Sequence, residues 1–217
     1  MTDLRDQLRH CFEGRVCVIG IGNTDSGDDG VGVVLAKAVI ERLNQSGYAS
    51  LASNVIIAGT SPERMIGSTS VMGYDHQIFL DAVEFGGKPG SMTFLNADEI
   101  SARFPQISTH KISVGLLARC IRESEGTDVW LLGIQPGSLK AMQVLSPAVQ
   151  RTMDILAEML CKLWISATTE GNTLFVMPDV RSLPRHEASR EHPEGFNSLD
   201  SRLRGNDTIN PVREQVL

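Results

Sequence analysis

The chain has 217 residues and a formal net charge of −6, with 41% hydrophobic and 21% charged residues. These proportions are ordinary for a globular protein and exclude a collagen-like, wholly disordered or membrane-embedded chain. The acidic balance argues against nucleic acid or an anionic membrane as the main partner, because both bind basic surfaces. The four cysteines form no CxxC pair and no signal peptide is recognisable. We therefore expect reduced thiols and a cytoplasmic protein.

Short apolar runs bounded by glycine or polar residues alternate with segments of helical periodicity. Such runs are typical of buried parallel strands. The expected strands are Val16–Gly22, Asn54–Ala58, Gln77–Val83, Ser91–Leu95 and Val129–Ile134. The expected helices begin at Asp28 or Asp29 (ending near Gly47), at Ser61, at Ser113 and at Ser146. This order predicts a three-layer α/β/α sandwich with a mostly parallel, mixed sheet of about five strands.

The helical pattern stops near Ile165. The last 52 residues contain no lysine and four of the nine prolines, without sustained periodicity. We therefore expect one α/β domain over residues 14–164 and a disordered appendage over 166–217. Residues 198–207 resemble the peptide read from dispersed bacterial genomic repeats, so an extended reading frame and a natural flexible tail are both open.

An acidic, glycine-rich loop follows the first expected strand, with the sequence GIGNTDSGDDG over residues 20–30. Its spacing matches neither the dinucleotide fingerprint nor the Walker loop. The carboxylates of Asp25, Asp28 and Asp29 would also repel phosphate, so the loop favours a cation. Helix capping explains one of the two adjacent aspartates and leaves the other unexplained.

Two further residues are expected at the same edge of the sheet as this loop. Asp81 ends an apolar strand, and ligands of open α/β sheets bind at the carboxyl ends of strands. His110 precedes the helix that begins at Ser113, and its loop should return to that edge. Two carboxylates and one imidazole without a thiolate suit a borderline divalent metal with open positions. A turn aspartate and a surface histidine are the structural alternatives.

Other candidate signals are weaker. Gln135 could orient a peptide, although a Gly/Pro turn explains its surroundings equally well. Glu63 could simply belong to the start of a short helix. The sequence has no Gly-x-Ser-x-Gly elbow and no cysteine in a nucleophile motif, so serine or cysteine peptidase chemistry has no support.

In combination, these segments resemble the hydrogenase maturation endopeptidases, which trim the C-terminal extension from the large subunit of nickel-iron hydrogenases. The resemblance covers about residues 14–164 and is closest to the type that processes the formate-hydrogenlyase hydrogenase. The motifs that carry it are Gly20-x-Gly22-Asn23, Gly27-Asp28-Asp29-Gly30-x-Gly32, Ser61-Pro62-Glu63, Leu80-Asp81-Ala82, Pro89-Gly90, Thr109-His110 and Gly133-Ile134-Gln135-Pro136.

The resemblance implies a cytoplasmic peptidase in which Asp29, Asp81 and His110 contact metal and Asp29 and Asp81 are catalytic. Many members carry glutamate in place of Asp29. The nickel is implied to be part of the substrate, a hydrogenase large-subunit precursor, and neither a nucleotide, nucleic acid nor a membrane is expected. Because Asp25 and Asp28 lie outside this set, we expect their replacement to be milder. Two alternatives stay open: a peptidase or amidase with its own metal, and a non-catalytic nickel or subunit chaperone.

Overall fold

A five-stranded sheet forms the centre of the protein in a computed structural model that describes residues 3–65, 73–103 and 114–171. The strand order is β2-β1-β3-β5-β4. The strands are β1 Val16–Ile21, β2 Val55–Gly59, β3 His76–Ala82, β4 Met92–Asn96 and β5 Asp128–Ile134. The first four in this order run parallel, and β4 runs antiparallel beside β5. The prediction of a mostly parallel, mixed sheet is confirmed.

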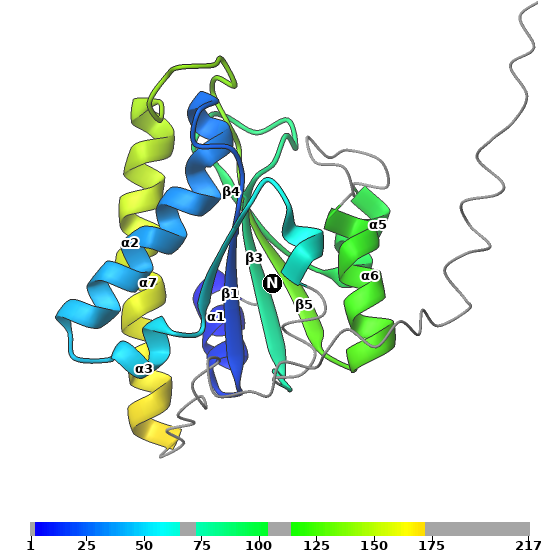
Figure 1. Ribbon diagram of the computed structural model, residues 1–217, viewed down its shortest axis with the longest axis vertical. Coiled ribbons are helices and arrows are strands. Elements are labelled where there is room, and N and C mark those ends of the chain that lie inside the picture. The colour runs from blue at the N-terminus through cyan, green and yellow to red at the C-terminus, as the bar shows by residue number, and fades with distance from the viewer. Residues whose placement is uncertain (1–2, 66–72, 104–113, 172–217) are drawn as a thin grey trace, which may run out of the picture. The chain divides into compact units, whose positions relative to one another are not determined.

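Helices cover both faces of this sheet (Figure 1). On one face lie α1 Leu4–Phe12, α2 Val31–Gln45, α3 Ala49–Ala52 and α7 Pro147–Gly171. On the other lie α5 Ala97–Arg103 and α6 Val114–Glu125. Two 3₁₀ turns, η1 Gly27–Gly30 and η2 Pro62–Met65, follow β1 and β2. The predicted α/β/α sandwich is therefore the observed fold. None of the helices described here is long and apolar enough to cross a membrane.

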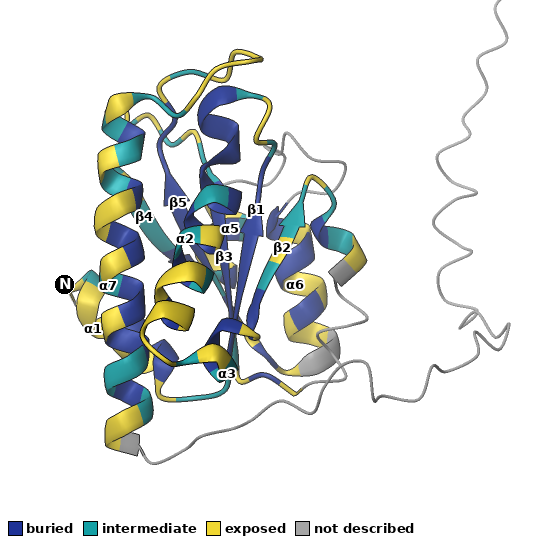
Figure 2. Ribbon diagram, turned by 60° about the vertical axis from the view of Figure 1, so that its left-hand side comes forward, coloured by how far each residue is buried: buried dark blue, intermediate teal, exposed yellow. Residues whose placement is uncertain are grey.

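Strand side chains alternate between the two helical layers. In β1, Val16 and Val18 pack with α1, α2 and α7, while Cys17 and Ile19 pack with α5 and α6. Because both faces are covered, β1 is buried throughout and β3 is buried from Gln77 to Asp81, as the dark blue strands of Figure 2 show. This double burial explains why the strands appear in the sequence as continuous apolar runs.

The element bounds differ from the expected ones at both ends of the domain. Helix α1 lies before residue 14, and Phe12 stacks on Trp164 of α7 with 5.1 Å between ring centroids. Helix α7 continues past Ile165 to Gly171, with Ala167 buried. The expected limits of 14–164 therefore omit packed residues, because α1 is a short helix of nine residues and the polar residues after Ile165 hide the end of α7. Of the appendage expected over residues 166–217, the part from residue 172 onward lies outside the described residues.

The connection from β1 to α2 is tightly packed because glycines remove side chains from it. Gly22 has a φ of +129°, and a Cβ at this position would lie 1.9 Å from the carbonyl oxygen of Asp29. A Cβ on Gly32 would lie 2.0 Å from the carbonyl oxygen of Leu80 and 2.4 Å from that of Ile21. The first turn of α2 therefore presses directly on the carboxyl ends of β1 and β3.

We predict that Gly32→Ala lowers the free energy of unfolding by about 1–3 kcal/mol, because the added methyl group overlaps two backbone carbonyls. Chemical denaturation measures this loss. In an unobstructed helix the same change would stabilise the protein by about 1 kcal/mol. A more stable variant would therefore contradict the close approach of α2 to β3.

Candidate active site at the carboxyl edge of the sheet

Asp29 and Asp81 both lie at the carboxyl edge of the sheet. Asp29 lies in η1, which follows β1 and contacts β3, and Asp81 lies near the end of β3. Both are nearly buried, with 7% and 5% of their surface exposed. The structure thus places both aspartates at the edge where the sequence predicted them, because parallel strands end on the same side.

Asp29 is held by the turn that precedes it. Its Oδ2 accepts a hydrogen bond from the backbone N–H of Asn23 at 3.1 Å. The side chain of Asn23 builds that turn, since its Oδ1 accepts from the N–H of Asp25 and its Nδ2 donates to Oγ of Ser26, each at 3.0 Å. The N-cap residue of α2 is Gly30, without a side-chain bond. The prediction that Asp28 or Asp29 caps this helix is therefore wrong.

Asp81 lies at a fixed register beside β5. It pairs with Gly133, and its Oδ1 accepts from the N–H of Ala82 at 2.8 Å. Its neighbours Phe79 and Leu80 pack on opposite faces, with Phe79 on the side of α5 and α6. By the alternation of the strand, Asp81 occupies the same sheet face as Phe79.

His110 lies outside the described residues, between the end of α5 and the start of α6. Two residues separate the end of helix α6 from β5, which begins at the amino edge of the sheet, where Asp128 pairs with His76. Its first residue, Val114, therefore lies toward the carboxyl edge, on the face that Asp81 shares. His110 stays a predicted member of the site.

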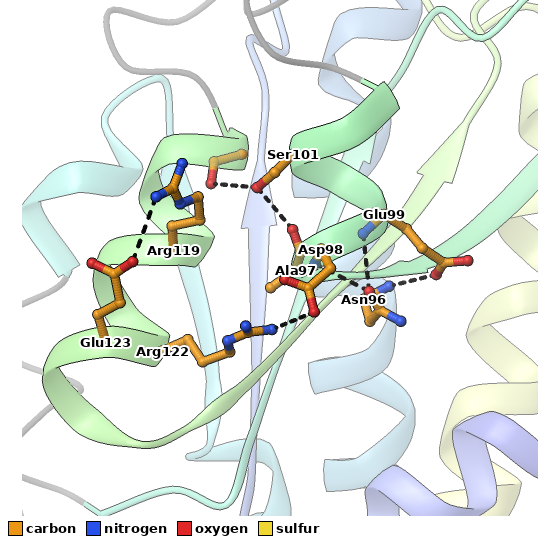
Figure 3. Close-up of polar contacts among 9 residues, drawn as sticks. Asn96, Ala97, Asp98, Glu99, Ser101, Arg119, Arg122 and Glu123 are labelled. Carbon is orange, nitrogen blue, oxygen red and sulfur yellow. Dashed lines mark hydrogen bonds and ion pairs between the residues drawn. The ribbon is translucent and has the colours of Figure 1, made fainter.

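Polar contacts fix the two helices that flank this segment (Figure 3). Asn96 and Glu99 form a capping box at the start of α5, with both side-chain to backbone distances at 3.0 Å. Arg122 of α6 donates to Asp98 of α5 at 2.8 Å. Ser101 reaches the carbonyl oxygen of Gly115 at 3.5 Å. The helices on either side of His110 are thus joined to one another.

Asp28 has a structural role that the sequence did not reveal. It is fully buried, and its carboxylate accepts hydrogen bonds from the N–H groups of Gly137, Ser138 and Ser146 at 2.7, 2.9 and 2.6 Å. Burial alone would raise the pKa of Asp28, but these backbone donors hold it below its usual value. That replacing Asp28 affects processing less than replacing Asp29 stays a prediction, but these contacts give Asp28 a structural role that the prediction did not include. The only signal in the sequence was the second aspartate, which capping left unexplained.

Gln135 also serves the framework of this edge. Its Oε1 accepts from the N–H groups of Phe85 and Gly87 at 2.9 and 3.1 Å, so it holds the loop that follows β3. Its backbone carbonyl accepts from Gly90 at 2.9 Å. The structure favours the structural alternative for Gln135 over the orientation of a bound peptide.

Within the described ranges, no group of three or more His, Cys, Asp or Glu side chains could hold a metal. Asp29 and Asp81 supply two hard oxygen donors, and the third predicted ligand is His110. The thiols of Cys11, Cys17 and Cys161 are buried, and burial raises the pKa of Cys17 to about 12. Thiols in this state are poor nucleophiles and metal ligands at neutral pH.

We predict that Asp28→Asn lowers the free energy of unfolding by about 1–3 kcal/mol, because an amide nitrogen would face backbone N–H donors. Since the pKa of Asp28 is lowered on folding, its contribution is complete above about pH 4 and is lost as the pH falls below that. Urea denaturation from pH 3 to 7 should show the wild type and the variant converging in acid. Asp25→Asn, at an exposed position, is the control, and equal stability of Asp28→Asn and wild type at pH 7 would contradict the role.

Comparison with known proteins identifies the family. The model of the HycI hydrogenase maturation proteases matches residues 37–163, a segment that includes Asp81 and His110 and begins after Asp29. The hydrogenase 3 maturation protease of Escherichia coli K12 is 30% identical over 117 residues, which are 54% of this chain and 69% of that protein. The hydrogenase 2 maturation protease of the same organism is 27% identical over 144 residues, 64% and 84% of the two chains.

Solved structures agree with this result. The crystal structure of the NiFe hydrogenase maturation protease HycI from Thermococcus kodakarensis is 28% identical and superposes with a TM-score of 0.63, covering 73% of this chain and 99% of that one. The hydrogenase maturating endopeptidase HybD from E. coli is 26% identical with a TM-score of 0.52, covering 72% and 93%. Because the family model spans more than half of the sequence, this chain belongs to the HycI family of hydrogenase maturation proteases.

Proposed function

We propose that this protease removes the C-terminal extension of a nickel-iron hydrogenase large-subunit precursor after nickel has been inserted. In this proposal Asp29, Asp81 and His110 recognise the nickel that the substrate carries. The observation that supports it most directly is the pair of nearly buried aspartates at one edge of the sheet, where η1 contacts β3.

The chemistry follows from the types of group at this edge. Two carboxylates and an imidazole bind a free divalent metal weakly and leave coordination positions for the substrate. Nickel seated in the precursor would hold the scissile peptide in place near Asp29 and Asp81. One of these carboxylates accepts a proton from a water molecule, and the water oxygen attacks the carbonyl carbon of the peptide bond. The C–N bond then breaks, and the leaving nitrogen takes up a proton.

The local hydrogen bonds fit such roles. Each aspartate has one oxygen anchored by a backbone N–H, from Asn23 for Asp29 and from Ala82 for Asp81. Anchoring restricts the rotation of a carboxylate and lowers the entropy that is lost when a substrate binds. Because the carboxylates are nearly buried, a docked precursor would exclude most of the remaining water from them.

We predict that Asp29→Asn, Asp81→Asn and His110→Ala each fold normally and slow processing of the nickel-loaded precursor by about 10²-fold or more. An asparagine keeps an oxygen that can accept the backbone hydrogen bond but removes the charge. The mobility shift of the precursor on a denaturing gel measures processing, and circular dichroism checks the fold.

Asp25→Asn is the matched control for these variants, because Asp25 is an exposed carboxylate in the same loop as Asp29. It should process the precursor at the wild-type rate. Cleavage retained by any two of the three site variants would refute the assignment. If Asp29 serves only to accept the bond from Asn23, the Asp29→Asn variant should process the precursor at the wild-type rate.

Our next prediction concerns whether the metal is bound by the protease itself or is carried by the precursor. The purified protein should contain well below one equivalent of nickel or zinc after dialysis, because the predicted ligands hold free metal weakly. It should cut nickel-loaded precursor without added metal and leave nickel-free precursor intact. Elemental analysis of the protein and the two cleavage assays measure these outcomes.

A full equivalent of metal that survives dialysis and is required for activity would favour a protease with its own metal. Binding of nickel-loaded precursor without cleavage would favour a chaperone.

A further inference from the structure

The connection between β5 and α7 exposes an unusual number of apolar side chains. Its central part, residues 139–145, has the sequence LKAMQVL and is named here the apolar loop. The side chains of Met142 and Val144 are 91% and 90% exposed, and Leu139 is 43% exposed. Single exposed apolar residues are common on protein surfaces. Three within six residues of one connection are not explained by packing in the described part of the chain.

The apolar loop is tied to the segment that leads into Asp29. The carboxylate of Asp28 binds the N–H groups on both sides of the loop, at Gly137 and Ser138 before it and at Ser146 after it. The N–H of Asp28 donates to the carbonyl of Ser138 at 2.9 Å. The loop is therefore anchored at both ends by the residue that directly precedes Asp29.

The middle of the loop is also fixed. The N–H of Met142 donates to the carbonyl oxygen of Asp25 at 2.8 Å. Met142 has a φ of +60°, the only positive value at a non-glycine residue in the described ranges. Such a conformation is unfavourable for methionine and persists only where surrounding contacts impose it. The exposed side chains are therefore presented in a defined position.

The loop lies at the carboxyl edge of the sheet, beyond the end of β5 and the start of α7 (Figure 1), and is exposed along most of its length (Figure 2). Side chains that are about nine-tenths exposed project from a surface and do not line a pocket. Such a surface fits an apolar patch on another macromolecule better than it fits a small ligand.

We propose that the apolar loop is the docking surface for an apolar patch on the folded large-subunit precursor, beside the segment that is cut. This inference rests on the proposed function. Its basis is the continuity of the loop with the candidate site, since Asp28 anchors the loop and Asp29 belongs to the site. A surface that is fixed before binding loses little conformational freedom when the partner arrives.

The test uses a double variant, Met142→Asn with Val144→Ser, in the full chain. Asparagine tolerates the positive φ at residue 142, so the backbone of the loop can be retained. With nickel-loaded precursor from the same organism as substrate, the concentration needed for half-maximal rate should rise about tenfold or more, because two apolar side chains are no longer buried on docking. The maximal rate should change by less than about twofold, because the aspartates are untouched.

Ile155→Gln is the matched control, because Ile155 is also exposed, at 64%, but lies on α7 away from the loop. Its half-saturating precursor concentration should equal that of the wild type. Oxidation with dilute hydrogen peroxide gives a second readout, measured by mass spectrometry. Bound precursor should protect Met142, while the buried Met153 should show little oxidation in either state.

The outcomes separate the docking surface from the proposed protease role. A loop variant that binds and cuts the precursor as well as the wild type would overturn the docking surface and leave the role intact. A wild-type protein that binds the precursor through the loop without cutting it would contradict the role and support the surface. A wild-type protein that neither binds nor cuts it would contradict both. Self-association in sedimentation that the loop variant abolishes would overturn the docking surface in favour of an interface between two copies.

Discussion

The buried carboxylate of Asp28 is the interaction on which the arrangement of the carboxyl edge depends. A buried charge is costly unless hydrogen bonds replace its water, and here three backbone N–H groups do so. The donors come from the connection after β5, whereas Asp28 follows β1. One side chain thus joins two connections that β3 separates in the sheet. Because the bonds are to backbone, they fix the course of the chain itself.

The two adjacent aspartates at this edge have different roles. Asp28 has a structural role, because its carboxylate accepts hydrogen bonds from the connection before α7. Asp29 accepts a hydrogen bond from Asn23 and lies where η1 contacts β3. The close approach depends on glycine at positions 22 and 32, where a side chain would overlap backbone carbonyls. The position of Asp29 relative to β3 is therefore set by backbone packing.

The proposed contacts with the substrate are also of two kinds. The aspartates are nearly buried and suit a small, charged target, whereas the loop of residues 139–145 offers exposed apolar side chains. A protease that acts once on one precursor needs recognition away from the bond that it cuts, because two carboxylates and a histidine carry little sequence specificity. The link through Asp28 would hold these two kinds of contact at a fixed separation.

The sequence determined the sheet, since strands buried on both faces appear as uninterrupted apolar runs, and it determined that Asp81 lies near the end of one of them. Parallel strands then require the loop with Asp29 to share its edge. The helices α1, α3 and α5 were not predicted, because each has nine residues or fewer. The role of Asp28 was decided only by tertiary structure: its donors lie 109, 110 and 118 residues away, and the backbone N–H groups that they contribute leave no mark in a sequence. Only the tertiary structure shows that the apolar stretch of residues 139–145 is exposed, because Asp28 binds the backbone at both of its ends and holds it at the carboxyl edge, outside the core.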